Sequence, residues 1–320
     1  MFGKIIGTGS YVPKEIVTNK DLAQYLDTDD TWIRERTGVK SRHISGDKET
    51  TADMAVKAAE KALENSGLLP DEIDLIIVSS VSSNLVLPST ACFVQKAINA
   101  KNAFCFDINV ACTGFITAYN ISQTFINTGL INTALIIGAE SLSKITDWSD
   151  RKTCILFGDG AGGVLLEANP QKKLLKEKLA TDGTRSTSLT AGYQQNKNPF
   201  YSEDSEGSYY LRMTGRDIFD FAVRDVANNI QEVMKDTPVD YLLLHQANLR
   251  IIEKIARKVK MPQEKFLTNM DKYGNTSAAS IPILLDEAVS SGKITLGKQQ
   301  KVIFTGYGGG LTWGSILMGL

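Results

Sequence analysis

Histidine is almost missing from this chain of 320 residues, in which His43 and His245 are the only two. A metal site built from three histidines is therefore excluded, and we expect no bound metal. Cysteine is also scarce, and no pair has the C-x-x-C spacing of a zinc ribbon or a thioredoxin-type redox site. We expect free thiols in a reducing compartment. The four cysteines are Cys92, Cys105, Cys112 and Cys154.

Long apolar runs and an excess of charge are missing as well. No stretch approaches the roughly 20 residues that a membrane-spanning helix needs. Residues 1–7 lack the apolar segment of a signal peptide and pass directly into strand-like sequence. The 35 basic and 36 acidic residues give a net charge of −1, so a basic surface for nucleic acid is not expected. These absences predict a cytosolic, cytoplasmic protein that binds neither nucleic acid nor a membrane.

What is present is an ordinary globular composition, with 42% apolar and 22% charged residues. The length predicts two domains or one double-sized α/β unit. Short apolar runs alternate with segments of helical period, which is typical of βαβ units. In the first half we expect strands at 4–7, 75–79, 103–108, 134–138 and 163–167, and helices at 52–66, 89–98 and 114–128. In the second half we expect strands at 174–180, 241–244, 265–268, 301–305 and 315–319, helices at 215–234, 249–259 and 278–290, and a polar surface excursion over 181–211.

The two halves resemble each other beyond the order of their elements. Residues 74–78 read Asp-Leu-Ile-Ile-Val and residues 240–244 read Asp-Tyr-Leu-Leu-Leu. Repetition of this kind predicts a duplicated α/β unit of about 150 residues. We place the halves at 1–170 and 171–320, with the active site between them at the carboxyl ends of strands.

Cys112 is the candidate nucleophile. It follows an apolar strand and small residues, in the run Asp-Ile-Asn-Val-Ala-Cys-Thr-Gly-Phe over 107–115, where a helix begins. A sulfur at a helix N-terminus is favoured as the thiolate by unpaired N–H groups and the helix dipole, and a thiolate attacks thioesters. The alternative is a buried structural thiol, which fits the other three cysteines better.

His245 and Asn275 are the groups of the second half that could act beside Cys112. His245 ends the apolar run 241–244, and Asn275 precedes the expected helix 278–290. Each has an ordinary structural explanation: His245 could be a core histidine, and Asn275 could be a helix cap. Together, a thiol, an imidazole and an amide at matched strand ends indicate an active site.

Two glycine-rich stretches are ambiguous. Residues 158–163 do not lie between a first strand and its helix, so a dinucleotide fingerprint is not indicated. In Gly308-Gly309-Gly310, a backbone N–H could complete an oxyanion hole with the N–H of Cys112. The alternative is a tight turn between two strands.

Two basic clusters have a structural and a functional interpretation. The expected helix 249–259 carries a basic stripe, which is either a solvated face or a docking site for an acidic partner. Its members are Arg250, Lys254, Arg257 and Lys258. The second cluster surrounds a tryptophan that could stack a base while its arginines pair phosphates, or could simply end a surface helix. It comprises Trp32, Arg34, Arg36, Thr37, Lys40 and Arg42.

Six motifs in this order resemble β-ketoacyl-acyl-carrier-protein synthase III of the thiolase-like superfamily, over essentially the full length. They are Trp32-Ile33-Arg34-Glu35-Arg36-Thr37-Gly38, Ala111-Cys112-Thr113-Gly114-Phe115, Phe157-Gly158-Asp159-Gly160-Ala161-Gly162, His245-Gln246-Ala247-Asn248-Leu249-Arg250, Gly274-Asn275-Thr276-Ser277-Ala278 and Gly308-Gly309-Gly310-Leu311-Thr312-Trp313-Gly314. The resemblance implies a homodimer with a five-layered α-β-α-β-α fold, built from two thiolase-like halves, and the initiation of type II fatty acid biosynthesis.

The resemblance also implies a ping-pong Claisen condensation. Cys112 would take an acyl group from acetyl-coenzyme A or a similar primer. His245 and Asn275 would bind the thioester oxygen of malonyl-acyl carrier protein and stabilise the enolate left by decarboxylation. The backbone N–H groups of Cys112 and Gly309 would bind the oxyanion. No cofactor is implied, since coenzyme A enters as a thioester substrate.

Further contacts follow from the same resemblance. Trp32 and Arg151 would sandwich the adenine of coenzyme A, with Arg36 and Thr37 nearby. Leu87 would shape the primer pocket across the dimer interface. Asp220 stands where a basic residue facing the carrier is common, which puts the extent of the docking patch in doubt. The acyl carrier protein would contact Gln246, Ala247, Asn248, Leu249 and Arg250.

Other enzymes of the superfamily fit less well. Thiolases use a second cysteine late in the chain, and none follows Cys154. Elongating synthases use two histidines of the second half, where His245 is alone. Hydroxymethylglutaryl-type synthases would need an added carboxylate base, which the sequence does not place.

Two alternatives lie outside the superfamily. A papain-like hydrolase has the same order of Cys, His and Asn, and would use Asn275 to orient His245, but its local cysteine signature is missing. A non-catalytic binding protein would form no acyl-cysteine.

Overall fold

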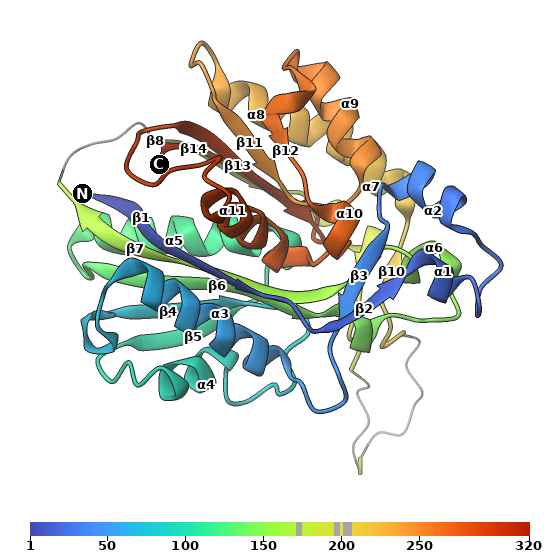
Figure 1. The fold of residues 1–320 in the computed structure, drawn as a ribbon, viewed down its shortest axis with the longest axis horizontal. Helices are drawn as coiled ribbons and strands as arrows, with labels where there is room; N and C mark the ends of the chain where they lie inside the picture. The colour runs from blue at the N-terminus through green and yellow to red at the C-terminus, as the bar shows by residue number, and fades with distance from the viewer. Residues whose placement is uncertain (171–174, 195–198, 201–206) are drawn as a thin grey trace.

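Two five-stranded sheets are stacked with helices between and outside them, as the computed structural model shows (Figure 1). The structure describes residues 1–170, 175–194, 199–200 and 207–320. Within these ranges, every helix is too short or too polar to span a bilayer. The cytosolic location expected from the sequence stays a prediction.

The first sheet comes from the N-terminal half. β4 pairs in parallel with β5 and β6, while β7 pairs antiparallel with β6 and β1. Every residue of β4 and β6 is buried, because helices cover both faces of these strands. The strands in spatial order are β1 (Phe2–Tyr11), β7 (Asp159–Asn169), β6 (Thr133–Ser141), β4 (Leu75–Ser79) and β5 (Phe104–Ile108).

The second sheet repeats this pattern of parallel and antiparallel pairs strand for strand. The predicted duplication is therefore confirmed. Residues 171–174 lie outside the described residues. The proposed boundary after residue 170 and the expected strand start at 174 both fall there, so that boundary stays a prediction. The strands are β12 (Phe266–Leu267), β11 (Tyr241–Leu244), β13 (Lys301–Gly308), β14 (Thr312–Gly319) and β8 (Leu175–Thr181).

Helices complete five layers, which confirms the expected α-β-α-β-α architecture. Between the sheets lie α5 (Gly114–Thr128) and α11 (Ser280–Ser290), both largely apolar and buried. Outside the first sheet lie α3 (Thr51–Ser66) and α4 (Thr90–Ala97), and outside the second lie α8 (Ala227–Met234) and α9 (Leu249–Val259) (Figure 1).

Shorter elements connect the layers, and several were not predicted. The expected helix 215–234 is interrupted, since a π-helical turn, η5 (Ala222–Val226), separates α7 (Gly215–Phe221) from α8. The others are β2 (Glu15–Thr18), α1 (Asn19–Leu22), α2 (Asp30–Thr37), β3 (Ser41–Ile44), η1 (Pro70–Glu72), η2 (Ala111–Thr113), η3 (Leu142–Ile145), α6 (Arg151–Cys154), η4 (Gly183–Ser188), β9 (Leu189–Thr190), β10 (Arg212–Met213), η6 (Gln263–Lys265), α10 (Met270–Tyr273) and η7 (Ser277–Ala279).

The segment 181–211 is not purely a surface excursion. Ser188 and Leu211 are buried, and β9 pairs with β10 to form a small ribbon. Leu189 packs against the apolar core of the second half. These few apolar contacts were not predicted, because most residues of the segment are polar. Positions 195–198 and 201–206 of the predicted excursion lie outside the described residues.

The loop that carries Asn275 and Ser277 rests directly on β6. An added Cβ at Gly138 would lie 2.2 Å from the backbone oxygen of Ala278. A side chain at this position would push η7 away from the first sheet, because the atoms it would meet belong to the backbone of Ala278 and Ala279. The absence of a side chain at Gly138 thus sets the distance between the two halves at this point.

We predict that Gly138→Ala destabilises the fold by about 1–3 kcal/mol through overpacking. Urea denaturation would measure the free energy of unfolding. Gly46→Ala is the matched control, since nothing lies within 4 Å of an added Cβ there. Equal stabilities of the two variants would show that η7 moves away from β6 without cost.

Candidate active site

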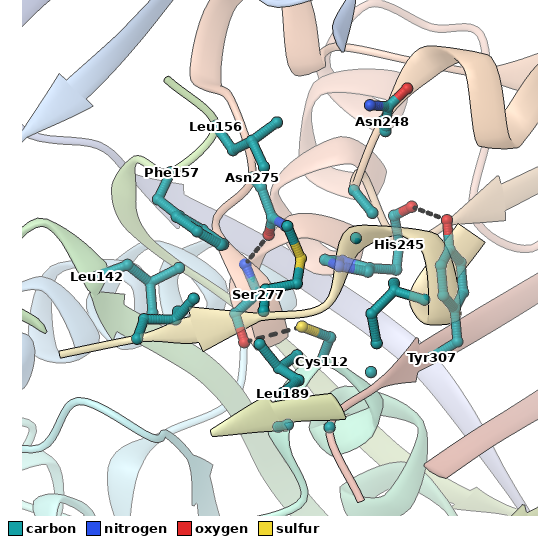
Figure 2. Close-up of a pocket in the computed structure, with 18 of the residues that line it drawn as sticks. Cys112, Leu142, Leu156, Phe157, Leu189, His245, Asn248, Asn275, Ser277 and Tyr307 are labelled. Atoms are coloured by element: carbon teal, nitrogen blue, oxygen red, sulfur yellow. Dashed lines mark hydrogen bonds between the residues drawn. The ribbon is translucent and has the colours of Figure 1, made fainter. Parts of the chain in front are cut away.

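A cavity of about 820 Å³ lies between the two halves. Cys112 lines it from the first half, and His245 and Asn275 line it from the second. Figure 2 shows these three side chains around the same space, with Ser277 between Cys112 and Asn275. The structure therefore brings the three predicted catalytic residues together at one site.

Cys112 lies in η2, immediately before α5. Ala111, the residue before it, has a φ of 45°, and an added Cβ at Gly308 would lie 2.9 Å from the Cys112 Cβ. The strand end of β13 therefore packs tightly against the cysteine, whose exposed fraction is 8%. The Cys112 Sγ donates a hydrogen bond to the Ser277 Oγ at 3.3 Å.

Burial raises the pKa of the Cys112 thiol to about 12, although the hydrogen bond with Ser277 lowers it in part. The helix that follows had led us to expect the thiolate. The structure differs, because the loss of hydration outweighs the favourable end of the helix. At neutral pH the resting sulfur is a thiol, so attack on a thioester requires that its proton be moved.

His245 follows β11 and is held in one orientation. Its backbone N–H donates to Thr305 O at 2.8 Å, and its Nδ1 lies 2.8 Å from the Ser280 Oγ. The same Oγ accepts a hydrogen bond from the backbone N–H of Gln246 at 3.3 Å. The hydroxyl proton of Ser280 is thereby directed to Nδ1, which leaves Nε2 as the protonated ring nitrogen. Burial lowers the pKa of His245 to about 3, so the ring is neutral.

Asn275 is fixed through its backbone and its side-chain oxygen. Its N–H donates to Leu156 O at 2.8 Å, and its Oδ1 accepts from the Ser277 N–H at 2.9 Å. The side-chain nitrogen is the end of the amide that remains to donate. In the described part of the chain no hydrogen bond joins Asn275 to His245, so the arrangement of a papain-like hydrolase is not present.

The predicted oxyanion and coenzyme A residues lie around the same cavity, with one exception. Gly309, Trp32, Arg36 and Thr37 line it, whereas Arg151 does not. The guanidinium groups of Arg36 and Arg151 lie 4.3 and 4.8 Å from the centre of the Trp32 ring. Both cations therefore already contact the ring that was predicted to stack on adenine.

The residues predicted to contact a carrier protein differ in their placement. Ala247 and Asn248 line the cavity, and Arg250 is exposed in the first turn of α9. Asn248 caps α9 and donates to Arg36 O at 3.0 Å, while Leu249 is half-buried. Gln246 is buried and donates to a strand carbonyl, so its side chain holds the strand end.

Leu87 is a surface residue of its own chain. It is 83% exposed and does not line the cavity. It belongs to a group of exposed apolar side chains on the loop after β4 and on the neighbouring α4 and β5. The group comprises Leu85, Val86, Leu87, Phe93 and Phe104. The predicted role in a primer pocket stays a prediction.

Several residues at the site were missed from the sequence. Leu189 lines the cavity from a segment predicted as surface, and Met213 lines it from the short stretch between that segment and the next expected helix. One sequence carries no pattern that would reveal either contact. Ser280 orients His245 and was hidden inside an expected helix. Glu140 lies beneath the site in β6, and an acidic residue inside an apolar strand was a signal that could have been used.

Comparison with known proteins identifies the family. The family models described as 3-oxoacyl-[acyl-carrier-protein (ACP)] synthase III and its C-terminal part match residues 106–183 and 231–320. The β-ketoacyl-[acyl-carrier-protein] synthase III of Enterococcus faecalis is 53% identical over 319 residues, which is 100% of this chain and 99% of the relative. The chain belongs to the 3-oxoacyl-[acyl-carrier-protein] synthase III family. It is an acyltransferase-type condensing enzyme that initiates fatty acid biosynthesis, as the resemblance predicted.

Solved structures agree with this assignment. The synthase III structure from Aquifex aeolicus is 43% identical, has a TM-score of 0.91, and is matched over 99% of this chain and 100% of that chain. The priming β-ketosynthase of the R1128 polyketide pathway is 31% identical with a TM-score of 0.91, over 99% and 96% of the two chains. Members of this synthase III fold therefore include a protein named for a polyketide pathway as well as those named for acyl carrier protein.

We predict that His245→Gln reduces the loss of stability on mild acidification. A histidine whose pKa falls from 6.5 to about 3 on folding contributes stability above pH 6.5, and this contribution is lost as the pH falls toward 3. The slope is at most about 1.4 kcal/mol per pH unit. Urea denaturation between pH 7 and 5 measures it, and identical slopes for the wild type and the variant would contradict a neutral, buried His245.

Proposed function

We propose that Cys112 is the nucleophile that accepts the acyl group from an acyl-coenzyme A primer. The observation that carries this proposal is the meeting of Cys112, His245 and Asn275 at one cavity without a hydrogen bond between the last two. A hydrolase would need Asn275 to orient the imidazole, but Ser280 has that position. His245 and Asn275 therefore do not occupy each other's donor groups, and the Ser277 backbone also hydrogen-bonds the imidazole.

The same two donors support the second half of the reaction. Nε2 of His245 and the side-chain nitrogen of Asn275 can both donate to the thioester oxygen of malonyl-acyl carrier protein. Decarboxylation leaves an enolate on that oxygen, and fixed donors in a dry cavity stabilise it more than they stabilise the substrate. Its carbon then attacks the acyl group on Cys112, which gives 3-oxoacyl-acyl carrier protein and carbon dioxide.

We propose that the backbone N–H groups of Cys112 and Gly309 bind the tetrahedral oxyanion. Both residues line the cavity, and the adjoining Gly308 is packed against the cysteine. The chemistry is thus carried by side chains and backbone amides of this chain, and no cofactor is proposed. Coenzyme A takes part as a thioester substrate.

We propose that coenzyme A enters past Trp32. The ring offers a stacking surface, and Arg36 and Arg151 offer positive charge for phosphates. Thr37 is buried and donates to Ile33 O, so it shapes the end of α2. Stacking of adenine between Trp32 and Arg151 requires that the arginine give up its contact with the ring.

We propose that the acyl carrier protein docks at the start of α9. Asn248 links this helix to α2 at the cavity, and Arg250 is exposed beside it. A basic residue at the mouth of the cavity would guide an acidic partner. Ala247 and Leu249 would complete the contact, with Gln246 supporting them from within. Asp220 is exposed and lies 3.9 Å from Arg216, which reduces the positive charge nearby.

We propose a homodimer formed through β5. This strand is at the edge of the first sheet, and Phe104 on it is 67% exposed. Open strand edges and grouped apolar side chains are covered in stable proteins. In such a dimer Leu87 would reach the primer cavity of the partner. We further propose that 1–170 and 171–320 are the duplicated units.

Cys112→Ala should abolish acylation by acetyl-coenzyme A but retain decarboxylation of malonyl-acyl carrier protein, because His245 and Asn275 remain. Intact-protein mass spectrometry would detect the acyl adduct, and release of carbon dioxide would measure decarboxylation. Cys154→Ala removes another buried thiol and should keep the adduct. A protein that only binds ligands would form no adduct even in the wild type.

Arg250→Glu should raise the KM for the carrier-bound substrate far more than the KM for a malonyl-pantetheine analogue, because the analogue lacks the acidic carrier. Steady-state kinetics with both substrates would measure this. Lys298→Glu is the charge-matched control, since Lys298 is exposed just before β13, at the end of the sheet opposite His245. Equal effects of Arg250→Glu on both substrates would exclude a docking role.

A further inference from the structure

Glu140 is a carboxyl group enclosed completely by the protein. It lies in β6 among apolar and small residues, and its exposed fraction is 0%. In the described residues no basic side chain forms an ion pair with it. A carboxylate withdrawn from water without a cation is costly, so a role beyond packing is worth seeking.

Hydrogen-bond donors surround this carboxyl group. Ser82 Oγ lies 2.5 Å from it, the Val81 N–H 3.1 Å and Ser80 Oγ 3.3 Å. The Ser277 hydroxyl also acts on it and lowers its pKa. Burial raises the pKa of Glu140 to about 7, although these four donors lower it in part. The group can therefore gain or lose a proton near neutral pH without moving.

Ser277 connects Glu140 to the reacting sulfur. Its Oγ accepts from the Cys112 Sγ at 3.3 Å, and the same hydroxyl is near enough to Glu140 to lower the pKa of that carboxyl group. Ser277 has a φ of 48°, which is unfavourable for a residue with a side chain, and the Oδ1 of Asn275 holds its N–H. The thiol donates to the hydroxyl (Figure 2), and a hydroxyl that accepts from the thiol keeps its own proton for donation to the carboxylate.

The alternative base is not free for this task. The Nδ1 of His245 faces Ser280, and its Nε2 carries the ring proton. A neutral imidazole in this tautomer donates to the substrate and has no lone pair left for the thiol. The thiol, whose burial opposes ionisation, still has to lose its proton during acyl loading.

We propose that Glu140 accepts the proton of Cys112, through the Ser277 hydroxyl, when the acyl group is loaded, and returns it after condensation. This rests on the proposed nucleophilic role of Cys112. Glu140 does not line the cavity, so it acts on the sulfur through Ser277 and does not touch substrate.

The proton and charge balance closes over one cycle. In loading, the thiol proton passes to Ser277 while the Ser277 proton passes to Glu140. The sulfur bonds to the acyl carbon, and coenzyme A leaves as its thiolate and takes a proton from solvent. In condensation, the enolate carbon displaces the Cys112 thiolate, which recovers the proton from Glu140. Neutral Glu140 in the acyl-enzyme also avoids repelling the incoming malonyl carboxylate.

Few other titratable groups face Glu140. Cys112 faces it from η2, and the charge of Glu140 raises the pKa of that thiol. The loop after β4 presents Ser80, Ser82 and a backbone amide, and η7 presents Ser277. On the neighbouring β7, Gly160 pairs with Glu140, and Asp159 bonds serines elsewhere. The neutral His245 lies on the far side of Ser277.

The pH dependence of acyl loading tests this relay. In rapid-quench assays with acetyl-coenzyme A and intact-protein mass spectrometry, loading of the wild type should rise with pH around 7, as Glu140 becomes ionised. Glu140→Gln should be about 100-fold slower and should lose that rise. Ser277→Ala should show the same slow loading and the same loss of the rise with pH, because it removes the hydroxyl between Cys112 and Glu140 and leaves the carboxyl group in place. Asp159→Asn alters a buried carboxyl group unconnected to the thiol and should keep the wild-type pH profile.

The outcomes separate this inference from the proposed function. A rise near pH 7 that persists in Glu140→Gln, even at a lower rate, would overturn the relay. If that variant does not fold, Ser277→Ala decides by the same criterion. An acyl group found on a residue other than Cys112 in the wild type would overturn the proposed function and the relay together. An acyl group on Cys112 with unchanged pH profiles in both variants would overturn the relay alone.

Discussion

The removal of one thiol from water is the constraint on which the rest of the site depends. Cys112 is enclosed where η2 meets the end of β13 and the η7 loop, with Gly308 leaving just enough room for it. A dry site strengthens each hydrogen bond that a developing negative charge receives. The same dryness raises the pKa of the thiol, so the proposed nucleophilic role of Cys112 needs an acceptor for its proton.

The division of the site between two sheets follows from the duplicated fold. Each half ends its central strands at the same cavity, so the first half supplies the sulfur and the second supplies the imidazole and the amide. Each proposed catalytic group lies on a short turn held by backbone hydrogen bonds. Rigid placement of this kind lowers the reorganisation needed during the reaction. The strained backbone at Ala111 and Ser277 lies where the two halves touch.

The regular elements were the part of the fold that the sequence predicted well. Four predictions agree with the observed bounds: the strands 75–79 and 241–244 and the helices 114–128 and 249–259. Strands buried on both faces leave short continuous apolar runs, and helices buried along one stripe leave a period of 3.6 residues. The π-helical turn in 215–234 was not predicted, since it changes no periodic signal that one sequence could show. The packed residues within 181–211 were hidden by polar neighbours.

By itself, the sequence determined which chemical groups are available: a cysteine beside a helix start, one histidine in the second half, and an asparagine in a glycine-flanked turn. It also determined the family, because six local motifs are rare in combination. Only the tertiary structure decided how these groups are arranged. Ser280 sets the tautomer of His245, Gln246 turns inward, and Glu140 lies within reach of Ser277. Such contacts join residues up to 137 positions apart, for Glu140 and Ser277, and no local pattern encodes them.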